Sequence, residues 1–403
     1  MTVRKNLLKK IVVIATALAV ALAPAAESAP KNVALKQITL LTNDIAAEGM
    51  VVTSKAIVIY SNVVGNSADI QLRAIDFTGA QIWSKTIDSG RDEVATAISV
   101  DPQGSIWLGG NSAPAVASES DTAVIGALDP DSVTVENPAQ LRADMKNTSL
   151  WQFSETGDLL EQIDSKATQP SLVEAISASA TGVSVLLSRD TGQSLALVKA
   201  GVFKKEVKIG SAKSKFNIIF RTADGSSSLF GSSSETLGGK RLAGRVDGIL
   251  LKVSKSGVIS RVVRSSATGA TRDWQSATAS NFLTGFVRSG RKIETAITKF
   301  NSTFAPTWTI RYPSTGKSLA ASGVKGSVFA IFEPTTALKG VKGWKPRKGQ
   351  SVVLEFDGKG RIINAFSDLL LSSPLSAGFS AEGGLIVLTT SGAILRSSTR
   401  QFK

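Results

Sequence analysis

The sequence of this 403-residue chain repeats one short pattern: an apolar strand, a polar turn closed by glycine, and a second strand. Four copies are clear, at residues 72–83, 150–160, 250–260 and 353–363. The glycine supplies the positive φ that a tight hairpin needs. One such hairpin cannot bury its apolar face alone, so the repetition indicates several similar β units stacked against one another.

Turn residues and apolar strands divide the chain into seven successive units, near residues 44–89, 90–168, 169–210, 211–267, 268–314, 315–370 and 371–403. The first six units each supply four strands, and the last supplies three. The alternating segment Val33 to Leu41 precedes the first unit. Pairing it with Ala393 to Ser398 would complete the last sheet, close a ring and hide the exposed edges. We therefore predict an all-β fold, a single β-propeller over residues 31–403 with seven four-stranded blades, six or eight being the alternative counts.

Two motifs resemble known propeller repeats. Residues 92–112, from Asp92 to Ser112, resemble the β-propeller repeats of secreted bacterial proteins. The pattern Asp-x-x-Gly-x-x-x-Trp at residues 76–83 is similar to the repeats of quinoprotein-type propellers. The second unit is longer than the others, and we expect an inserted loop at about residues 113–148. The resemblance implies the fold and assigns no activity, because propellers carry unrelated functions.

The N-terminus has the three parts of a secretory signal peptide. Basic residues open it, Ile11 to Ala23 is an apolar run, and Ala23-Pro24-Ala25 offers a small-residue cleavage site. We predict a signal peptide over residues 1–28, cleaved after Ala25 or Ser28, and a secreted or cell-envelope protein. An uncleaved membrane anchor is the alternative. A lipoprotein is excluded, because the chain has no cysteine to carry the lipid.

The chain also lacks histidine, which excludes Ser–His–Asp triads and His-ligated metals. The remaining catalytic candidates are carboxylates, lysine, tyrosine and serine. The acids near the starts of several units would either form a cation-binding ring or cap backbone amides between blades, and we predict capping; they are Asp44, Asp92, Glu174 and Asp273. Two carboxylates from different blades would suit a polysaccharide-active enzyme. We expect a non-enzymatic protein with no cofactor and no metal.

The charge is +14, with 46 basic and 32 acidic residues. Three expected loops between second and third strands concentrate it, at residues 238–245, 288–292 and 339–348. They hold three, three and five basic residues and no acid, and they belong to consecutive units. Trp344 stands among the basic residues, away from any apolar strand pattern. The predicted contacts for an anionic partner are Arg241, Arg245, Arg291, Lys292, Trp344, Lys345, Arg347 and Lys348.

These observations favour an exported, monomeric binding or scaffold propeller of the bacterial envelope. Its basic loops would contact an anionic envelope polymer or an acidic protein, and a membrane surface is a further partner. Export makes nucleic acid a poor candidate, although its charge would suit. Two alternatives stay open: a polysaccharide-active enzyme using carboxylates of different blades, and a purely structural surface protein. The basic loops would then be a solvated surface without a partner.

Overall fold

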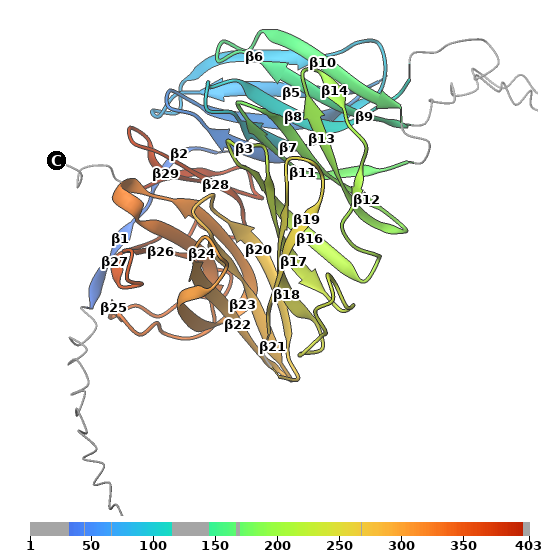
Figure 1. The fold of residues 1–403 in the computed structure, drawn as a ribbon. Helices are drawn as coiled ribbons and strands as arrows, with labels where there is room; N and C mark the ends of the chain where they lie inside the picture. The colour runs from blue at the N-terminus through green and yellow to red at the C-terminus, as the bar shows by residue number, and fades with distance from the viewer. Residues whose placement is uncertain are drawn as a thin grey trace, which may run out of the picture.

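The computed structural model describes residues 32–43, 45–65, 67–114, 145–166, 170–266 and 268–397. The expected signal peptide, Asp44 and most of the expected insertion lie outside these residues. Within them the fold is all-β, with a single 3₁₀ turn at Val324–Gly326 and no α-helix (Figure 1). None of the helical structure in these residues is long or apolar enough to cross a membrane.

Five separate sheets follow the expected units. The first holds β3 (Gly49–Val52), β4 (Ile57–Val64), β5 (Ala68–Ile75) and β6 (Gln81–Ile87). The second holds β7 (Glu93–Val100), β8 (Ile106–Ser112), β9 (Asn147–Phe153) and β10 (Leu159–Lys166). The third holds β11 (Leu172–Ser179), β12 (Gly182–Arg189), β13 (Gly192–Lys199), β14 (Val202–Phe203) and β15 (Val207–Lys208). The fourth holds β16 (Ser214–Arg221), β17 (Ser227–Ser233), β18 (Asp247–Val253) and β19 (Ile259–Ser265). The fifth holds β28 (Pro374–Ser380), β29 (Gly384–Thr389), β30 (Ile394–Arg396) and β2 (Thr39–Thr42).

The remaining strands form one nine-stranded sheet. They are β20 (Thr271–Ala277), β21 (Phe282–Ser289), β22 (Lys292–Phe300), β23 (Pro306–Ser322), β24 (Val328–Pro334), β26 (Val352–Phe356), β27 (Ile362–Ser367), β1 (Val33–Gln37) and β25 (Val341–Lys342). The 17-residue strand β23 pairs with β22 through residues 306–313 and with β24 through residues 314–322. The prediction of seven separate blades is therefore wrong: five blades are separate. No turn interrupts β23, so the fifth and sixth expected units share one sheet.

The N-terminal segment differs from the expectation of one strand. β1 lies parallel to β27, with Leu35 opposite Ala365, whereas β2 lies antiparallel to β30, with Leu40 opposite Leu395. Ile38 separates β1 from β2, and its side chain is buried in the core, with 1% exposed. Only the second part of the predicted strand thus lies beside the C-terminal strand, and ring closure by the whole segment is not confirmed.

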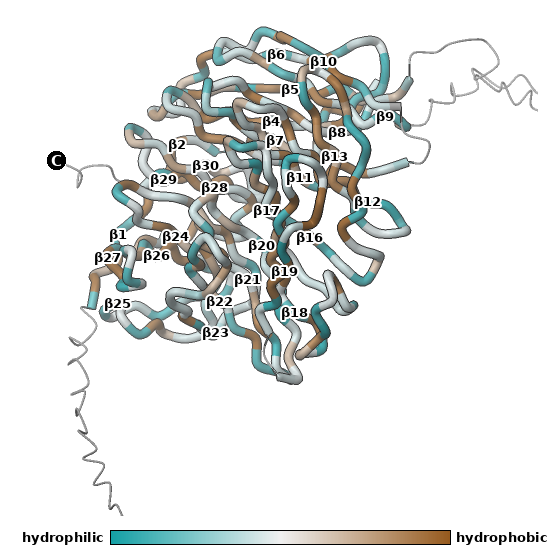
Figure 2. The backbone as a smooth tube through the Cα atoms, in the orientation of Figure 1, coloured by the Kyte–Doolittle hydropathy of each residue, from teal (hydrophilic) through white to brown (hydrophobic). Residues whose placement is uncertain are grey.

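The sheets pack side by side through their first strands, and the protein is a β-propeller. Contacts run from β3 to β7, β11, β16, β20, β23 and β28 in that order, and β28 contacts β3 in turn. Ser376 of β28 donates its hydroxyl to the carbonyl of Met50 in β3, at 3.2 Å. The apolar core lies between neighbouring sheets, and Figure 2 shows hydrophobic segments along the strands and hydrophilic ones in the connections.

Antiparallel order gives each sheet two ends with different connections. The turns between first and second strands, and between third and fourth strands, are short and define what we name the turn face. Trp83 and Trp308 each donate an indole N–H to a turn carbonyl of another unit, at 3.0 Å to Glu155 and 3.2 Å to Gly358. The loops between second and third strands emerge at the opposite end, which we name the loop face.

Candidate functional site: a basic loop face

All three basic loops lie on the loop face, as the sequence predicts. They connect β17 to β18, β21 to β22 and β24 to β26. Their eleven basic side chains are all exposed; these are Lys240, Arg241, Arg245, Arg288, Arg291, Lys292, Lys339, Lys342, Lys345, Arg347 and Lys348. The strands β18 and β21, which border the first two loops, and β25, which lies within the third, are found in the lower part of the molecule in Figure 1.

Strand pairing links the roots of the first two loops. Val246, at the end of the first loop, forms a bridge with Thr271 of β20. Thr271 in turn pairs with Arg288, where the second loop begins. Neighbouring strands are about 4.8 Å apart, so the two roots lie about 10 Å from each other.

A second set of pairs links the second loop to the third. Glu294 follows the second loop and pairs with Pro313 of β23. The carbonyl of Pro313 accepts a hydrogen bond from the amide of Thr335, where the third loop begins, at 3.1 Å. The roots of all three loops therefore follow one another across adjacent strands.

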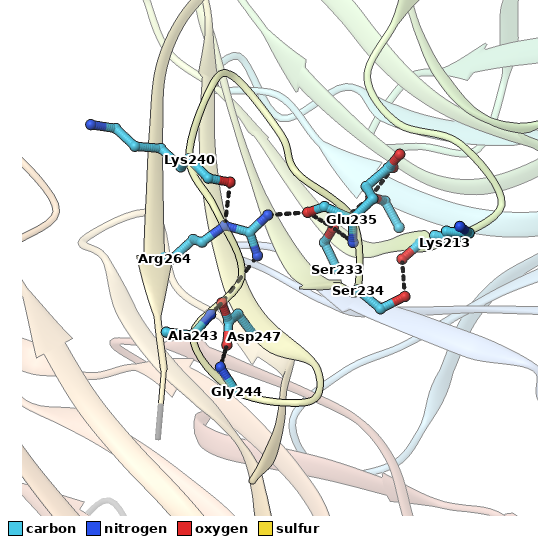
Figure 3. A network of polar contacts seen from close by, with 10 residues as sticks. Lys213, Ser233, Ser234, Glu235, Lys240, Ala243, Gly244, Asp247 and Arg264 are labelled. Carbon is cyan, nitrogen blue, oxygen red and sulfur yellow. Dashed lines mark hydrogen bonds and ion pairs between the residues drawn. The ribbon is translucent and has the colours of Figure 1, made fainter. Parts of the chain in front are cut away.

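A buried ion pair holds the first loop in place (Figure 3). Arg264 of β19 meets Asp247 at 3.1 Å, with the two side chains 7% and 0% exposed. The guanidinium also donates to the carbonyl of Lys240 at 3.0 Å and to that of Glu235. The Asp247 carboxylate accepts from the amides of Ala243 and Gly244, at 3.0 and 2.8 Å. The loop backbone is thus fixed from both sides, while its basic side chains remain exposed.

The hydrogen bonds to Asp247 determine its protonation. Burial alone would raise the pKa of this carboxyl. The amides of Ala243 and Gly244 and the Arg264 guanidinium donate hydrogen bonds that help to outweigh burial, and the pKa lies below its ordinary value. Asp247 is therefore a carboxylate at neutral pH, and it neutralises Arg264 rather than the loop's exposed cations.

The third loop is held by packing as well as by hydrogen bonds. Glu333 accepts from the amide of Gly349 at 2.8 Å. Leu338 and Val341 are buried in a core cluster, and Trp344 is half-buried against the same cluster. Trp344 therefore anchors the loop, which the polar sequence around it does not suggest. Because Trp344 packs inward, the structure supports its predicted contact with an anionic partner less than it supports the contacts predicted for the exposed cations.

The loop cations have few acidic partners. Lys292 meets Glu294 at 2.9 Å. No other basic residue of the three loops makes an ion pair with an acid among the described residues. Ten of the eleven loop cations therefore have no ion-pair partner among the described residues, and Lys292 is paired.

A cavity of about 300 Å³ opens on the loop face, where β16 and β20 begin and beside residues 317–319 of β23. Lys215, Lys317 and Asp273 contribute its charged groups. Burial raises the pKa of Asp273, and Asn217 donates a 3.1 Å hydrogen bond to its carboxyl. Two lysines facing one acid suit a small anionic group, and the sequence pattern did not reveal this cavity.

The predicted capping role of the acids is seen at Asp92, whose carboxylate accepts from the amide of Ala68 in the preceding unit at 2.7 Å. Glu174 lies half-buried on β11. Among the described residues, no group of three or more acids is arranged to hold a metal ion. Asp44 and the acids of the expected insertion lie outside those residues; the insertion's acids are Glu119, Asp121, Asp129, Asp131, Glu136 and Asp144.

Two carboxylates line a cavity of about 350 Å³ on the turn face, Asp101 and Glu155. Asp101 accepts from the amides of Gln103 and Ser105 of its own turn, both at 2.9 Å. Glu155 pairs with Lys55 at 2.5 Å. Local structure therefore accounts for both carboxylates.

Solved structures similar to this chain are β-propellers. The streptogramin B lyase structure matches 91% of this chain and 97% of its own, with a TM-score of 0.51 and 12% identity. The WD40 β-propeller domain of Doa1 matches 92% and 98%, with a TM-score of 0.51 and 8% identity. The β-propeller domain of Cps50 (Swd1) from Myceliophteria thermophila matches 89% and 99%, with a TM-score of 0.50 and 10% identity. No model of a protein family matches the chain, and neither does any curated protein. Identities this low show the fold alone.

Proposed function

We propose that this chain is an exported, non-enzymatic binding propeller of the bacterial envelope whose loop face binds an anionic partner. The observation that carries the proposal is the set of ten exposed cations, unpaired among the described residues, on three loops with neighbouring roots. The loop roots lie about one Debye length apart, which is about 8 Å at physiological salt, so the electrostatic potentials of the three loops add. A single charged loop far from the others would produce a weaker potential.

Order in the loops strengthens the proposal. The Arg264–Asp247 pair fixes the first loop, and the buried Leu338 and Val341 fix the third. A preordered surface loses less conformational freedom on binding than a mobile one. An extended polyanion that contacts several loops releases counterions from its own charges, which makes binding depend steeply on salt.

The export part of the proposal rests on the N-terminal sequence. The basic opening, the apolar run Ile11 to Ala23 and the site at Ala23-Pro24-Ala25 are in the order of a signal peptide. Phosphorylated polymers and acidic polysaccharides are the anionic polymers such a protein would meet outside the cell. N-terminal sequencing of the protein from its own host should find a start at residue 26 or 29, and an intact Met1 would contradict cleavage.

The polysaccharide-active alternative has less support in the described residues. The lyase among the similar structures shares only 12% identity with this chain. On the turn face, Asp101 binds amides of its own turn and Glu155 forms an ion pair with Lys55. The loop-face cavity beside β16 and β20 has Asp273 as the only acid among its lining residues. A binding role requires none of these acids to react.

The test is charge reversal on the loop face. The triple variant Arg291→Glu, Lys345→Glu and Arg347→Glu should fold normally, because exposed charges contribute little to stability. Its affinity for long-chain polyphosphate at about 0.1 M salt should fall at least about 100-fold, because the charge of the face changes by about six units. Polyphosphate serves as a polyanion of simple chemistry.

The matched control reverses three exposed lysines on the turn face, Lys255→Glu, Lys325→Glu and Lys359→Glu. Net charge changes equally in the two variants. The control should keep most of the parent's affinity. Equal losses of affinity in both variants would show that only net charge matters. Unchanged affinity in the loop-face variant would show that the loop face does not bind the polyanion.

A further inference from the structure

Exposed leucines accompany the basic loops on the loop face. Leu369 and Leu370 are 61% and 46% exposed in the connection between β27 and β28. This connection lies against the third basic loop, because Gln350 bridges to Ser372 and the amide of Ser351 donates to the carbonyl of Leu371 at 2.8 Å. The leucine pair is thus fixed beside the loop that holds five basic residues.

The first basic loop repeats this combination. Leu242 is 36% exposed and directly follows Arg241. The backbone around it is held by Asp247, which accepts from the next two amides, those of Ala243 and Gly244. Two ordered loops of one face therefore present apolar side chains next to exposed cations.

Single exposed leucines are common on protein surfaces and need no partner. A neighbouring pair beside a strongly basic loop combines the two attractions of a membrane-binding surface. Anionic headgroups attract lysine and arginine, and the boundary between headgroups and acyl chains takes up leucine. A water-soluble polyanion offers only the first of these. A flat bilayer also contacts all loops of one propeller face at once.

We infer that the loop face docks on the surface of a bilayer containing anionic lipid, with Leu369 and Leu370 inserted at the headgroup boundary. The inference rests on the proposed function, since it names the partner of the same basic face. The cations bring the face to the membrane, and the leucines distinguish a lipid surface from a soluble polyanion.

The chain contains a matched control for the leucine pair. Leu159 and Leu160 are 51% and 56% exposed, and they follow Asp158 just as Leu369 follows Asp368. They begin β10 directly after a turn of the turn face. The two pairs have the same chemistry and similar exposure at opposite ends of the propeller.

The first experiment compares two double variants, Leu369→Ser with Leu370→Ser and Leu159→Ser with Leu160→Ser. Binding is measured to vesicles of phosphatidylglycerol and phosphatidylcholine and, separately, to polyphosphate. Together the exposed parts of the loop-face pair amount to about one leucine side chain, so its loss should lower vesicle affinity about 10- to 100-fold. Polyphosphate affinity should stay unchanged, and the turn-face variant should match the parent for both probes.

The outcomes separate the two proposals. If the parent binds polyphosphate but not the anionic vesicles, or if both double variants bind vesicles like the parent, the lipid inference is wrong and the basic face stands. If neither probe binds, the proposed function fails as well. Vesicle binding lost only in the loop-face variant supports the inference.

The absence of cysteine allows a second, site-specific measurement. Leu370→Cys and Leu160→Cys each create one position for an environment-sensitive fluorophore. On adding anionic vesicles, the label at position 370 should shift to the blue, and the label at position 160 should not. Because the signal reports one position, it distinguishes loop-face docking from binding through the apolar run 11–23. Equal shifts at both positions, or no shift at position 370, would overturn the inference.

Discussion

The buried pair of Arg264 and Asp247 gives a sharp test of how the first basic loop is held. In the variant Asp247→Asn the carboxylate becomes an amide of nearly the same shape. Arg264, 7% exposed, then has no charged partner, and the amides of Ala243 and Gly244 lose a charged acceptor.

The expected cost follows from this geometry. Breaking a buried pair by removing one partner costs about 3–5 kcal/mol, because the other charge stays buried. The asparagine oxygen can still accept one amide hydrogen bond, which places the expected loss of unfolding free energy near the lower end, at about 3 kcal/mol. The matched change Glu155→Gln breaks an exposed pair with Lys55, whose side chains are 34% and 75% exposed, and should cost less than about 1 kcal/mol.

Urea denaturation of the parent and the two variants measures these losses. Hydrogen exchange provides a local readout, because the amides of Ala243 and Gly244 should lose protection in Asp247→Asn before the strands do. A loss below about 1 kcal/mol with unchanged protection would refute the reasoning and show that the loop is held by other contacts.

Three further predictions concern the rest of the fold. Gly360→Ala should destabilise by about 1–3 kcal/mol, because its φ is +79° and a Cβ would lie 2.8 Å from Trp308, whereas Gly358→Ala has open space and should change thermal denaturation little. Deleting residues 32–42 should lower the melting temperature by more than about 5 °C, because β27 and β30 each lose one of their two neighbouring strands and buried Ile38 is removed; a truncation as stable as the parent would argue against ring closure by these strands. Because the pKa of Asp247 is lower in the folded state than its ordinary 3.8, its stabilisation is complete above about pH 5 and is lost as pH falls through the ordinary value towards the folded one. Urea midpoints between pH 5 and pH 3 should therefore fall more in the parent than in Asp247→Asn, and equal slopes would contradict this role.

Much of the architecture could be predicted because it is encoded locally. A turn that needs glycine at positive φ, such as the one at Gly157 or Gly360, leaves a signature that repeats with each unit. The limits of the separate sheets follow the expected units for the same reason. What failed is the boundary at residues 314–315, where a Ser-Thr-Gly-Lys stretch resembles a turn but continues β23. Whether these four residues form a turn or continue the strand depends on which strands lie beside them, and a local sequence pattern does not contain that information.

The candidate site was predictable in its charges and not in its supports. Runs of lysine and arginine on three expected loops are visible in the sequence, and the structure places all three on one face. The pairing of Arg264 with Asp247 joins residues of two strands, and neither residue stands in a pattern that sets it apart. The polar neighbours of Trp344 hide its packing, because its apolar contacts come from distant parts of the chain. Leu369 and Leu370 lie at an expected boundary between units. Two adjacent leucines in such a polar connection were the sequence feature that could have revealed the exposed pair.

The central claim is that three loops act as one anion-binding surface, and the salt dependence of binding tests it most directly. Affinity for polyphosphate is measured between about 50 and 300 mM salt for the parent and for three variants, each with the basic residues of one loop changed to alanine. The slope of log affinity against log salt should become shallower in every variant, by about 0.7–0.9 for each phosphate-binding cation that is removed. The largest change should follow removal of the five cations of the third loop. A slope that depends on one loop alone, or that no variant changes, would contradict a shared surface.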